Sequence, residues 1–265
     1  MKAWRFIDSR TLPAVLNMAI DEAILAMHVE GQSPPTLRIY QWSPPAISLG
    51  YFQRRHGIDL VSCERQGIDV VRRLTGGRAV LHYQDLTYAV VAGTSDGLPS
   101  SAAGAYRLIC EGLLTAFRTL GLEAELGHQD VIVPRSDICF LTSTTGDILH
   151  KGRKLVGSAQ TWRCSSMLQH GSITLEPHVD VWANIQKDTS MARTDYEEML
   201  KQRMTSIQEI LGYIPETGEI SRAIQDGMSR AFHMELKAGQ LTPEELTLVQ
   251  TVASRCAHEV ANCGK

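Results

Sequence analysis

The sequence predicts an α+β protein with a mixed, largely antiparallel central sheet flanked by helices, and with a helical C-terminal tail. Two observations lead to this prediction. Short strand-like runs cluster between long segments of helical periodicity, and strands and helices do not alternate regularly as they would in a doubly wound fold. The chain has 265 residues, of which 43% are hydrophobic and 21% charged, so it is long enough to bury a substantial core.

Two long helices are predicted in the first half of the chain. Over residues 13–31, Pro13 is suited to a first helical turn, and apolar residues recur at helical spacing from Leu16 to Met27. Residues 104–120 repeat the pattern, with leucines and a phenylalanine on one side.

Strands are predicted where apolar runs are bounded by turn residues. These runs are 36–41, 46–51, 70–73, 79–82, 86–92, 147–150, 155–162 and 167–175. The first two are joined by the turn Trp42-Ser43-Pro44-Pro45, and residues 151–154 form a second turn of hairpin type.

The tail is predicted to be helical from about residue 195. Thr242-Pro243-Glu244-Glu245 is typical of a capping box at the start of the last helix. Polar residues at 185–195 mark the boundary of the core. We therefore expect a catalytic core over residues 1–190 and a helical segment over 191–265 that packs on the same domain.

Composition narrows the possible functions. The net charge of −3 gives no basic footprint for nucleic acid, and no apolar run is long enough to span a membrane. The first residues lack the apolar stretch of a signal peptide, so we expect a cytoplasmic protein. No pair among the six cysteines has CxxC spacing, which indicates free thiols and neither a disulfide framework nor a zinc site.

Four segments carry side chains suited to chemistry, and each has a structural alternative. Around Gly76-Gly77, Arg72, Arg73 and Arg78 would hold an anionic or carbonyl-rich group, or they flank a tight turn and are solvated. The segment is not a Walker loop, because it lacks the Gly-Lys-Ser/Thr ending.

The other three segments each contain one reactive side chain. Lys154 either enters a pocket or is exposed at a hairpin. Cys139 is an inert core thiol unless a nearby cation favours its thiolate. His82 and His170 either line a site or satisfy backbone groups.

Together these segments resemble the superfamily of lipoate and biotin protein ligases and octanoyltransferases. The resemblance extends over roughly residues 1–185 and rests on four segments in the family's order, 17–23, 37–53, 72–77 and 152–160. It implies the catalytic-domain fold of that family, and it identifies residues 37–53 with the family's first hairpin.

Three features are similar to the octanoyltransferases of the LipM type, which look like lipoate ligases. Arg78 stands where ligases usually have a third glycine. Cys139-Phe140 stands where these transferases carry the cysteine of an acyl thioester, and Lys154 follows 15 residues later. The large accessory domain of many ligases also lacks a counterpart in this sequence.

The resemblance implies a reaction and its partners. Cys139 would take octanoyl from acyl carrier protein and pass it to a lysine of a lipoyl domain or glycine-cleavage H protein, while Lys154 lowers the pKa of the thiol. No cofactor or metal is implied, and we expect a monomer. The implied substrate-binding residues are Arg72, Arg73, Thr75, Gly76, Gly77, Arg78, His82, Gly157, Ser158, Ala159, His170 and Gly171. His82 and His170 are candidate proton carriers.

Three alternatives remain open at this stage. A lipoate-protein ligase would use ATP and magnesium, with Lys154 on the adenylate and Cys139 in ordinary packing. An amidotransferase would move octanoyl between two lipoyl-accepting proteins, and a binding module would only sequester lipoyl domains. One departure from the family concerns Tyr83, which stands where many relatives have an aspartate after the histidine; Asp85 would replace that aspartate only if the local backbone shifts.

Overall fold

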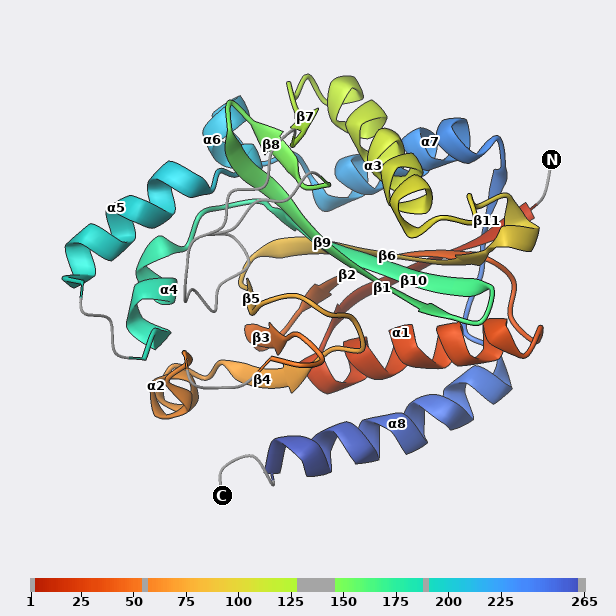
Figure 1. The fold of residues 1–265 in the computed structure, drawn as a ribbon, viewed down its shortest axis with the longest axis horizontal. Helices are drawn as coiled ribbons and strands as arrows, with labels where there is room; N and C mark the ends of the chain where they lie inside the picture. Colours follow the sequence, from red (N-terminus) through yellow and green to blue (C-terminus); the bar gives the residue numbers. More distant parts are fainter. Residues whose placement is uncertain (1–2, 54–56, 128–145, 188–190, 262–265) are drawn as a thin grey trace.

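The structure is a computed structural model that describes residues 3–53, 57–127, 146–187 and 191–261, with side chains as far as residue 256. Cys139, the predicted nucleophile, lies outside these residues. The elements form two sheets with helices on both faces of the larger one (Figure 1).

The main sheet has eight strands in the order β11-β1-β2-β6-β10-β9-β8-β7. Their bounds are β1 Ala3–Leu12, β2 Thr36–Trp42, β6 Asp85–Gly93, β7 Glu125–Leu126, β8 Ile148–His150, β9 Arg153–Arg163, β10 Ser166–Thr174 and β11 Glu235–Ala238. Strand β1 is parallel to both of its neighbours, and the other paired strands are antiparallel. The mixed, largely antiparallel sheet and the α+β class are confirmed.

The second sheet has three strands in the order β4-β3-β5. They are β3 Ala46–Leu49, β4 Asp69–Arg72 and β5 Val80–His82. The hairpin expected within residues 37–53 is wrong, because β2 pairs with β1 and β6 while β3 pairs with β4 and β5. Pro44 and Pro45 have no N–H to continue a ladder, and the chain crosses there from one sheet to the other.

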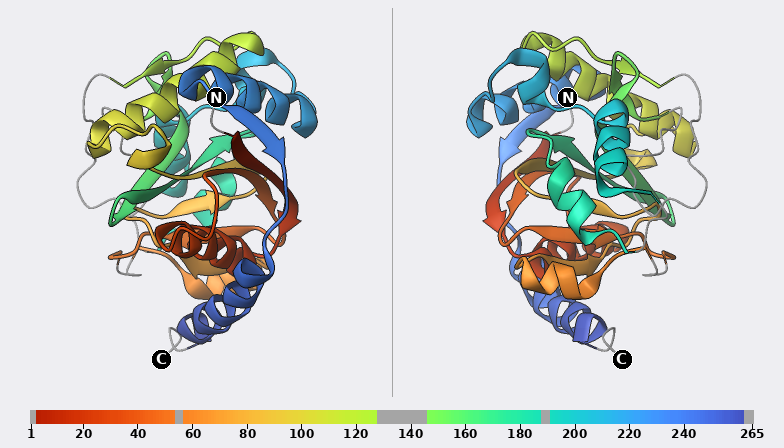
Figure 2. Two further views of the ribbon diagram at one scale, coloured as in Figure 1. Left: turned by 90° about the vertical axis from the view of Figure 1, so that its right-hand side faces the viewer. Right: turned by 90° about the vertical axis from the view of Figure 1, so that its left-hand side faces the viewer.

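Helices cover the two faces of the main sheet (Figure 2). α3 (Ala102–Thr119) and α7 (Thr217–Phe232) pack together over one face. In α3, Ile109, Leu113 and Phe117 are fully buried at a spacing of four residues, and each such side chain contributes about 1.5–3 kcal/mol by leaving water. α1 (Ala14–Val29) and α8 (Pro243–Ala261) pack together on the other face.

Apart from the helices on the main sheet, a separate cluster of apolar side chains joins the small sheet to short helices. Its helices are α2 Leu60–Arg65, α4 Val179–Ile185 and α5 Arg193–Arg203, and α6 Ile207–Leu211 follows them. Trp182 of α4 and Leu200 of α5 are buried there against β3 and β5. This packing fixes the small sheet, whose strand ends border the site described below.

The tail is mostly helical but contains a strand that the sequence pattern did not predict. Strand β11 adds a parallel edge beside β1, which was also missed. The capping box of α8 is confirmed, since Glu245 N donates to Thr242 Oγ1 at 3.2 Å and Thr242 N donates to Glu245 Oε2 at 2.8 Å. Among the helices described, none is both long and apolar enough to cross a membrane.

Candidate active site

A cavity with about 410 Å³ of empty space, including its solvent-open part, is bordered by strands of both sheets. It is lined by Met18, Tyr40, Trp42, Ser48, Arg73, Gly77, Val80, His82, Thr87, Gly157, Ser158, Ala159, His170, Gly171 and Ser172. Most of the predicted substrate-binding residues are therefore brought together here, although they lie as far apart in the sequence as Arg73 and Gly171.

One wall consists of small residues on two paired strands. Ser158 of β9 is opposite Gly171 of β10, and Ala159 is opposite His170. Small side chains leave open space between the strands and the glycine loop, while Met18, Trp42 and Val80 supply apolar surface. The cavity is suited to a slender, largely apolar ligand with one polar end.

Gly77, in the loop of residues 74–79, also lines the cavity, and glycine is needed both in this loop and at Gly50, which contacts it. Gly77 has φ of 93°, a left-handed conformation that side chains disfavour. A Cβ atom built on Gly50 would lie 1.9 Å from the carbonyl oxygen of Gly77, so the end of β3 touches this loop backbone to backbone.

Arg73 holds this loop in place from beneath. Its Nη2 donates to the carbonyl oxygens of Gly76 and Arg78, at 2.7 and 2.8 Å. Its Nε donates to Thr75 Oγ1, and its Nη1 donates to both oxygens of Ser48. All three guanidinium nitrogens donate to the loop or to Ser48, and Arg73 is 4% exposed, so Arg73 clamps the loop.

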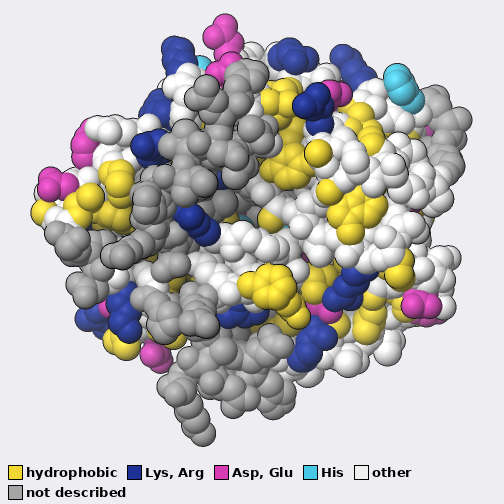
Figure 3. Space-filling model, in the orientation of Figure 1, with side chains coloured by type: hydrophobic (Ala, Val, Ile, Leu, Met, Phe, Trp, Pro, Cys, Tyr) yellow, Lys and Arg dark blue, Asp and Glu magenta, His cyan; other side chains and the backbone are white. Residues whose placement is uncertain are grey.

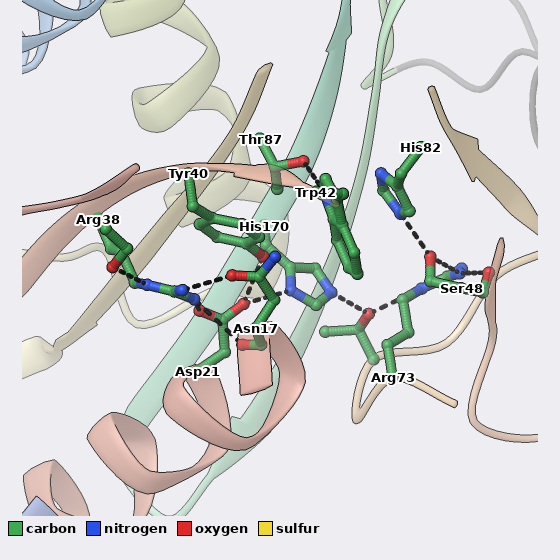
Figure 4. Close-up of polar contacts among 12 residues, drawn as sticks. Asn17, Asp21, Arg38, Tyr40, Trp42, Ser48, Arg73, His82, Thr87 and His170 are labelled. Atoms are coloured by element: carbon green, nitrogen blue, oxygen red, sulfur yellow. Dashed lines mark hydrogen bonds and ion pairs between the residues drawn. The ribbon is translucent and has the colours of Figure 1, made fainter. Parts of the chain in front are cut away.

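Two carboxylate–imidazole–hydroxyl chains converge on Arg73, and Figure 4 shows Asp21 and His170 of the first chain and the contact of His82 with Ser48 in the second. In the first, His170 Nδ1 lies 3.0 Å from Asp21 Oδ2, and His170 Nε2 lies 2.7 Å from Thr75 Oγ1. Burial lowers the pKa of His170, so the ring is neutral at pH 7. Nδ1–H then donates to the carboxylate and Nε2 accepts from Thr75, which leaves His170 better placed to orient the loop than to carry protons.

The second chain runs through His82. Its Nδ1 lies 2.8 Å from Asp85 Oδ2, and its Nε2 lies 2.8 Å from Ser48 Oγ. Trp42 stacks on the imidazole with ring centroids 3.9 Å apart. These three contacts fix the orientation of the His82 imidazole in the cavity wall.

Asp85 reaches His82 through a tight turn. Gln84 has φ of 51°, and this left-handed residue folds the chain back between β5 and β6. Asp85 Oδ2 also accepts from Ser172 Oγ at 2.6 Å. Asp85 is therefore the carboxylate that contacts His82, while Tyr83 packs against His178.

Asp21 lies on α1 and is the carboxylate of the first hydrogen-bonded chain. Burial alone would raise its pKa, but the Arg38 guanidinium at 2.6 Å and hydrogen bonds from His170 and Tyr40 outweigh burial and hold the pKa of Asp21 below its usual value. Burial, together with the Asp21 charge, raises the pKa of Tyr40 well above its ordinary value. Asp21 is therefore ionised, and Tyr40 donates to it.

Lys154 is 2% exposed, so the alternative of a solvated hairpin lysine is wrong. Its Nζ lies 2.9 Å from Asp147 Oδ2, which is equally buried. The turn before it is tight, since Lys151 and Gly152 both have positive φ. Lys154 is three residues from Gly157 on β9 but is not among the described side chains that line the cavity.

The remaining predicted residues border the cavity without lining it. Arg72 Nη1 donates to three carbonyl oxygens, those of Gly50, Tyr51 and Gln53. Thr75 is a fully buried residue of the loop, and Gly76 and Arg78 contribute the carbonyl groups that Arg73 binds. Their predicted contact with a ligand stays a prediction.

Sequence reasoning missed several residues of this network. Asp21, Arg38, Tyr40, Trp42, Ser48, Thr87 and Ser172 were not singled out. Asp21 and Arg38 offered one signal, because both lie at positions of the helix and strand pattern that face the core. A charged residue at such a position requires a partner.

Comparison with known proteins places the chain in a family. Residues 13–229 match the family model described as "Lipoyl protein ligase A/B catalytic domain", so the chain belongs to the lipoyl protein ligase A/B catalytic domain family.

Curated relatives named octanoyltransferase LipM match nearly the whole chain, and two of them serve as examples. The relative from Geobacillus kaustophilus is 38% identical and covers 95% of this chain and 94% of its own length. The relative from Bacillus subtilis is 35% identical with the same coverage.

Solved structures agree on the fold. A lipoate-protein ligase A bound with ATP superposes with a TM-score of 0.80 at 23% identity, covering 96% of this chain and 95% of the other. A bi-partite lipoate protein ligase from Thermoplasma acidophilum, described with its E2 lipoyl domain, gives 0.78 at 23% identity, covering 96% and 93%.

Proposed function

We propose that this chain is an octanoyltransferase, which moves octanoyl from acyl carrier protein to a lysine of a lipoyl domain or glycine-cleavage H protein through a thioester on Cys139. The observation that carries the proposal is the similarity, over nearly the whole chain, to octanoyltransferases that are 35–38% identical. The ligase structures are less similar in sequence and support the fold alone.

The lining of the cavity is compatible with an acyl ligand. Its small-residue wall and the apolar side chains of Met18, Trp42 and Val80 suit an eight-carbon chain, whose burial is favourable by about 0.8 kcal/mol per methylene. The rigid backbone around Gly76 and Gly77 would accept the polar thioester end.

Covalent transfer proceeds in two half-reactions. The Cys139 thiolate attacks the thioester carbonyl of the donor, a new S–C bond forms, and the carrier leaves as its thiolate and takes up a proton. The neutral amine of the acceptor lysine then attacks this thioester, forms the amide, loses a proton and releases Cys139. Because the donor protein and the acceptor protein react in separate steps, a narrow site has to accommodate only one of them at a time.

Among the cysteines that the structure describes, the three buried ones are poor candidates for the nucleophile. Burial raises the pKa of Cys63 to about 11 and raises that of Cys110 further. Cys256 is buried, and Cys164 is exposed in the turn between β9 and β10. A reactive thiol requires thiolate, which burial disfavours.

Lys154 is proposed to favour the Cys139 thiolate. The ammonium is fixed by Asp147, and this carboxylate also offsets part of its charge. Lys154 would therefore lower the thiol pKa less than an unpaired lysine, and each unit of lowering corresponds to about 1.4 kcal/mol.

The test is intact-mass analysis after incubation with octanoyl-acyl carrier protein without ATP. We expect one octanoyl adduct that maps to Cys139, that disappears in Cys139→Ser and that is retained in the matched control Cys164→Ser. An adduct retained in Cys139→Ser would exclude this nucleophile.

Two further arms address the alternatives. Acceptor modification that depends on ATP and free octanoate or lipoate, without an adduct, would identify a ligase. Loading from an octanoylated lipoyl domain but not from the carrier would identify an amidotransferase. No modification under any condition would leave a binding module.

A further inference from the structure

A second, smaller cavity adjoins the acyl cavity and has a different lining. It is lined by Leu81, Tyr83, Asp85, Ser172, Thr174, Glu176, His178, Trp182 and Met204, and it has about 280 Å³ of empty space including its solvent-open part. Ser172 lines both spaces, so the two cavities border the same residue. Met204 pairs with Lys154 in an isolated β-bridge, which places this space near Lys154 as well. We call it the Asp85 cavity.

Two residues of this lining have a buried polar atom without a hydrogen-bond partner. Asp85 is 4% exposed. Its Oδ2 accepts from His82, Thr87 and Ser172, whereas its Oδ1 has no donor. His178 Nε2 also lacks a partner, and only one other such side-chain atom occurs in the part of the chain that the structure describes. Leaving a buried polar atom unpaired is costly, so this pair of atoms indicates a ligand that donates hydrogen bonds.

The lining of the Asp85 cavity is negatively charged. Asp85 and Glu176 belong to it, and no lysine or arginine is among its described residues. Burial lowers the pKa of His178, although the carboxylates of Glu176, Asp180 and Asp85 oppose this effect, so the ring is neutral at pH 7. Figure 3 shows Lys, Arg and hydrophobic side chains around a hollow on one face of the molecule, so the negative lining is not a general feature of the surface.

The rest of the lining is suited to an alkyl chain. Leu81, Trp182 and Met204 are buried, and the ring of Tyr83 lies 4.3 Å from that of His178. A primary alkyl ammonium ion matches both parts, because it combines an apolar stem with three hydrogen-bond donors and a positive charge.

We propose that the Asp85 cavity binds the side chain of the acceptor lysine. The methylenes pack against the apolar lining, and the ammonium donates to Asp85 Oδ1 and His178 Nε2. The inference rests on the proposed function, and it assigns the route by which the acceptor reaches the acyl cavity.

Three other occupants fit less well. The phosphopantetheine arm of the donor carries a negative phosphate, which Asp85 and Glu176 would repel. Among the described residues, no group of three or more His, Cys, Asp and Glu side chains could hold a metal ion. A water molecule would satisfy the two polar atoms but would leave the apolar part of the lining without a contact.

His178 also has a chemical role in this arrangement. The lysine ammonium must lose a proton before its nitrogen attacks the thioester, and the neutral Nε2 is the acceptor beside it. The N–H bond breaks, the proton moves to Nε2, and the electron pair left on nitrogen forms the amide bond. Glu176 and Asp180 favour the imidazolium that results, which returns the proton to solvent because His178 is only partly buried.

The first test measures binding without catalysis. The wild type, labelled with ¹⁵N-histidine, is titrated with n-butylammonium, which mimics a lysine side chain, and the imidazole signals are followed by NMR. The signal that is missing in His178→Gln identifies His178. We expect this signal to shift and saturate with n-butylammonium but not with inorganic ammonium, which lacks the stem.

A carboxylate variant tests the charge. Asp85→Asn keeps the shape but puts an amide N–H group at one of the two oxygen positions, so n-butylammonium should bind about tenfold more weakly. The matched control is Asp226→Asn, which replaces an exposed aspartate on α7 and should bind as the wild type does.

The second test separates the two half-reactions in His178→Gln. Glutamine can accept a hydrogen bond but cannot take the proton, so transfer from the preloaded enzyme to a lipoyl domain should be about a hundredfold slower, with loading unchanged. The wild-type transfer rate should fall as the pH drops below about 6.5, because His178 becomes protonated, and the variant should lack this fall. Normal loading also shows that the variant is folded.

Other outcomes overturn the inference in distinct ways. No saturable shift with n-butylammonium excludes the site, and an equal response to inorganic ammonium shows a cation site without a stem pocket. Wild-type transfer by His178→Gln removes the proton acceptor, and equal losses in both half-reactions assign His178 to the fold of the cavity wall. Saturable n-butylammonium binding in a wild type that forms no thioester supports the amine site and contradicts the proposed transfer.

Discussion

Arg73 Nη1 donates to the carbonyl oxygen of Ser48 at 2.7 Å and joins the end of β3 to the glycine loop. Two buried hydrogen-bonded chains end at the same guanidinium. One runs from Asp21 through His170, and the other runs from Asp85 through His82. The loop that walls the cavity is therefore held by the core of the protein. Its geometry is fixed before any ligand arrives, which is the condition for a preorganised site.

Replacing Arg73 with lysine should loosen this loop. A lysine ammonium has three donors on one atom and cannot span Thr75, Ser48 and the two loop carbonyls. We expect the free energy of unfolding to fall by about 3 kcal/mol, since hydrogen bonds from charged groups contribute about 1.5–3 kcal/mol each. Urea unfolding measures this, with Arg193→Lys as an exposed control that should change stability by less than about 0.5 kcal/mol. Equal stability of the two variants would show that Arg73 is not a clamp.

Two glycines at the loop should respond differently to alanine. A Cβ on Gly50 would collide with the Gly77 carbonyl, whereas a Cβ on Gly76 would meet nothing within 4 Å. We expect Gly50→Ala to destabilise the fold by about 1–3 kcal/mol and Gly76→Ala to be nearly neutral. Thermal unfolding compares them directly. Destabilisation by Gly76→Ala alone would contradict the backbone contact between β3 and the loop.

The Lys154–Asp147 pair allows a test by coupled substitutions. Lys154→Met should cost about 3–5 kcal/mol of stability, because it leaves the Asp147 carboxylate buried without its cation. Lys154→Met combined with Asp147→Leu should recover most of that loss, because both charges are then absent. Denaturant midpoints of the two single variants and the double variant decide this. An additive loss in the double variant would rule out a direct interaction between the two side chains.

Stability should fall as the pH is lowered from 7 towards 5. The pKa of His170 is lowered by burial, so the unfolded chain binds more protons than the folded one below an ordinary histidine pKa of about 6.5. Folding stability is therefore full above that value and declines as the pH falls towards the lower folded pKa. Each unit between the two pKa values contributes about 1.4 kcal/mol.

The measurement is urea unfolding across this pH range for the wild type and His170→Gln. The variant should have a shallower slope between pH 7 and 5 than the wild type has. Asp21 has a lowered pKa, so its contribution persists to more acidic pH than an ordinary aspartate would allow. Equal slopes in the wild type and His170→Gln would remove His170 as the source.

The local pattern of apolar residues predicted much of the fold, because their spacing indicates which face of a helix or strand is buried. The repeat that ends at Met27 predicted α1, and Thr242 with Glu245 predicted the start of α8. Strand β11 escaped prediction because Glu235–Ala238 is only four residues long and three of its residues are exposed. Its pairing with β1 depends on a neighbour more than 230 positions away.

The sequence by itself determined the fold class and the segments that supply the cavity wall, from the glycine loop to Gly157 and Gly171. The tertiary structure decided the partners: Asp21 with His170 across 149 positions, Asp85 with His82 across a left-handed turn, and Lys154 with Asp147 in the interior. The reason is physical. Composition and spacing specify which side chains are available, but hydrogen bonds and ion pairs form only where strand register and packing bring atoms within about 3 Å.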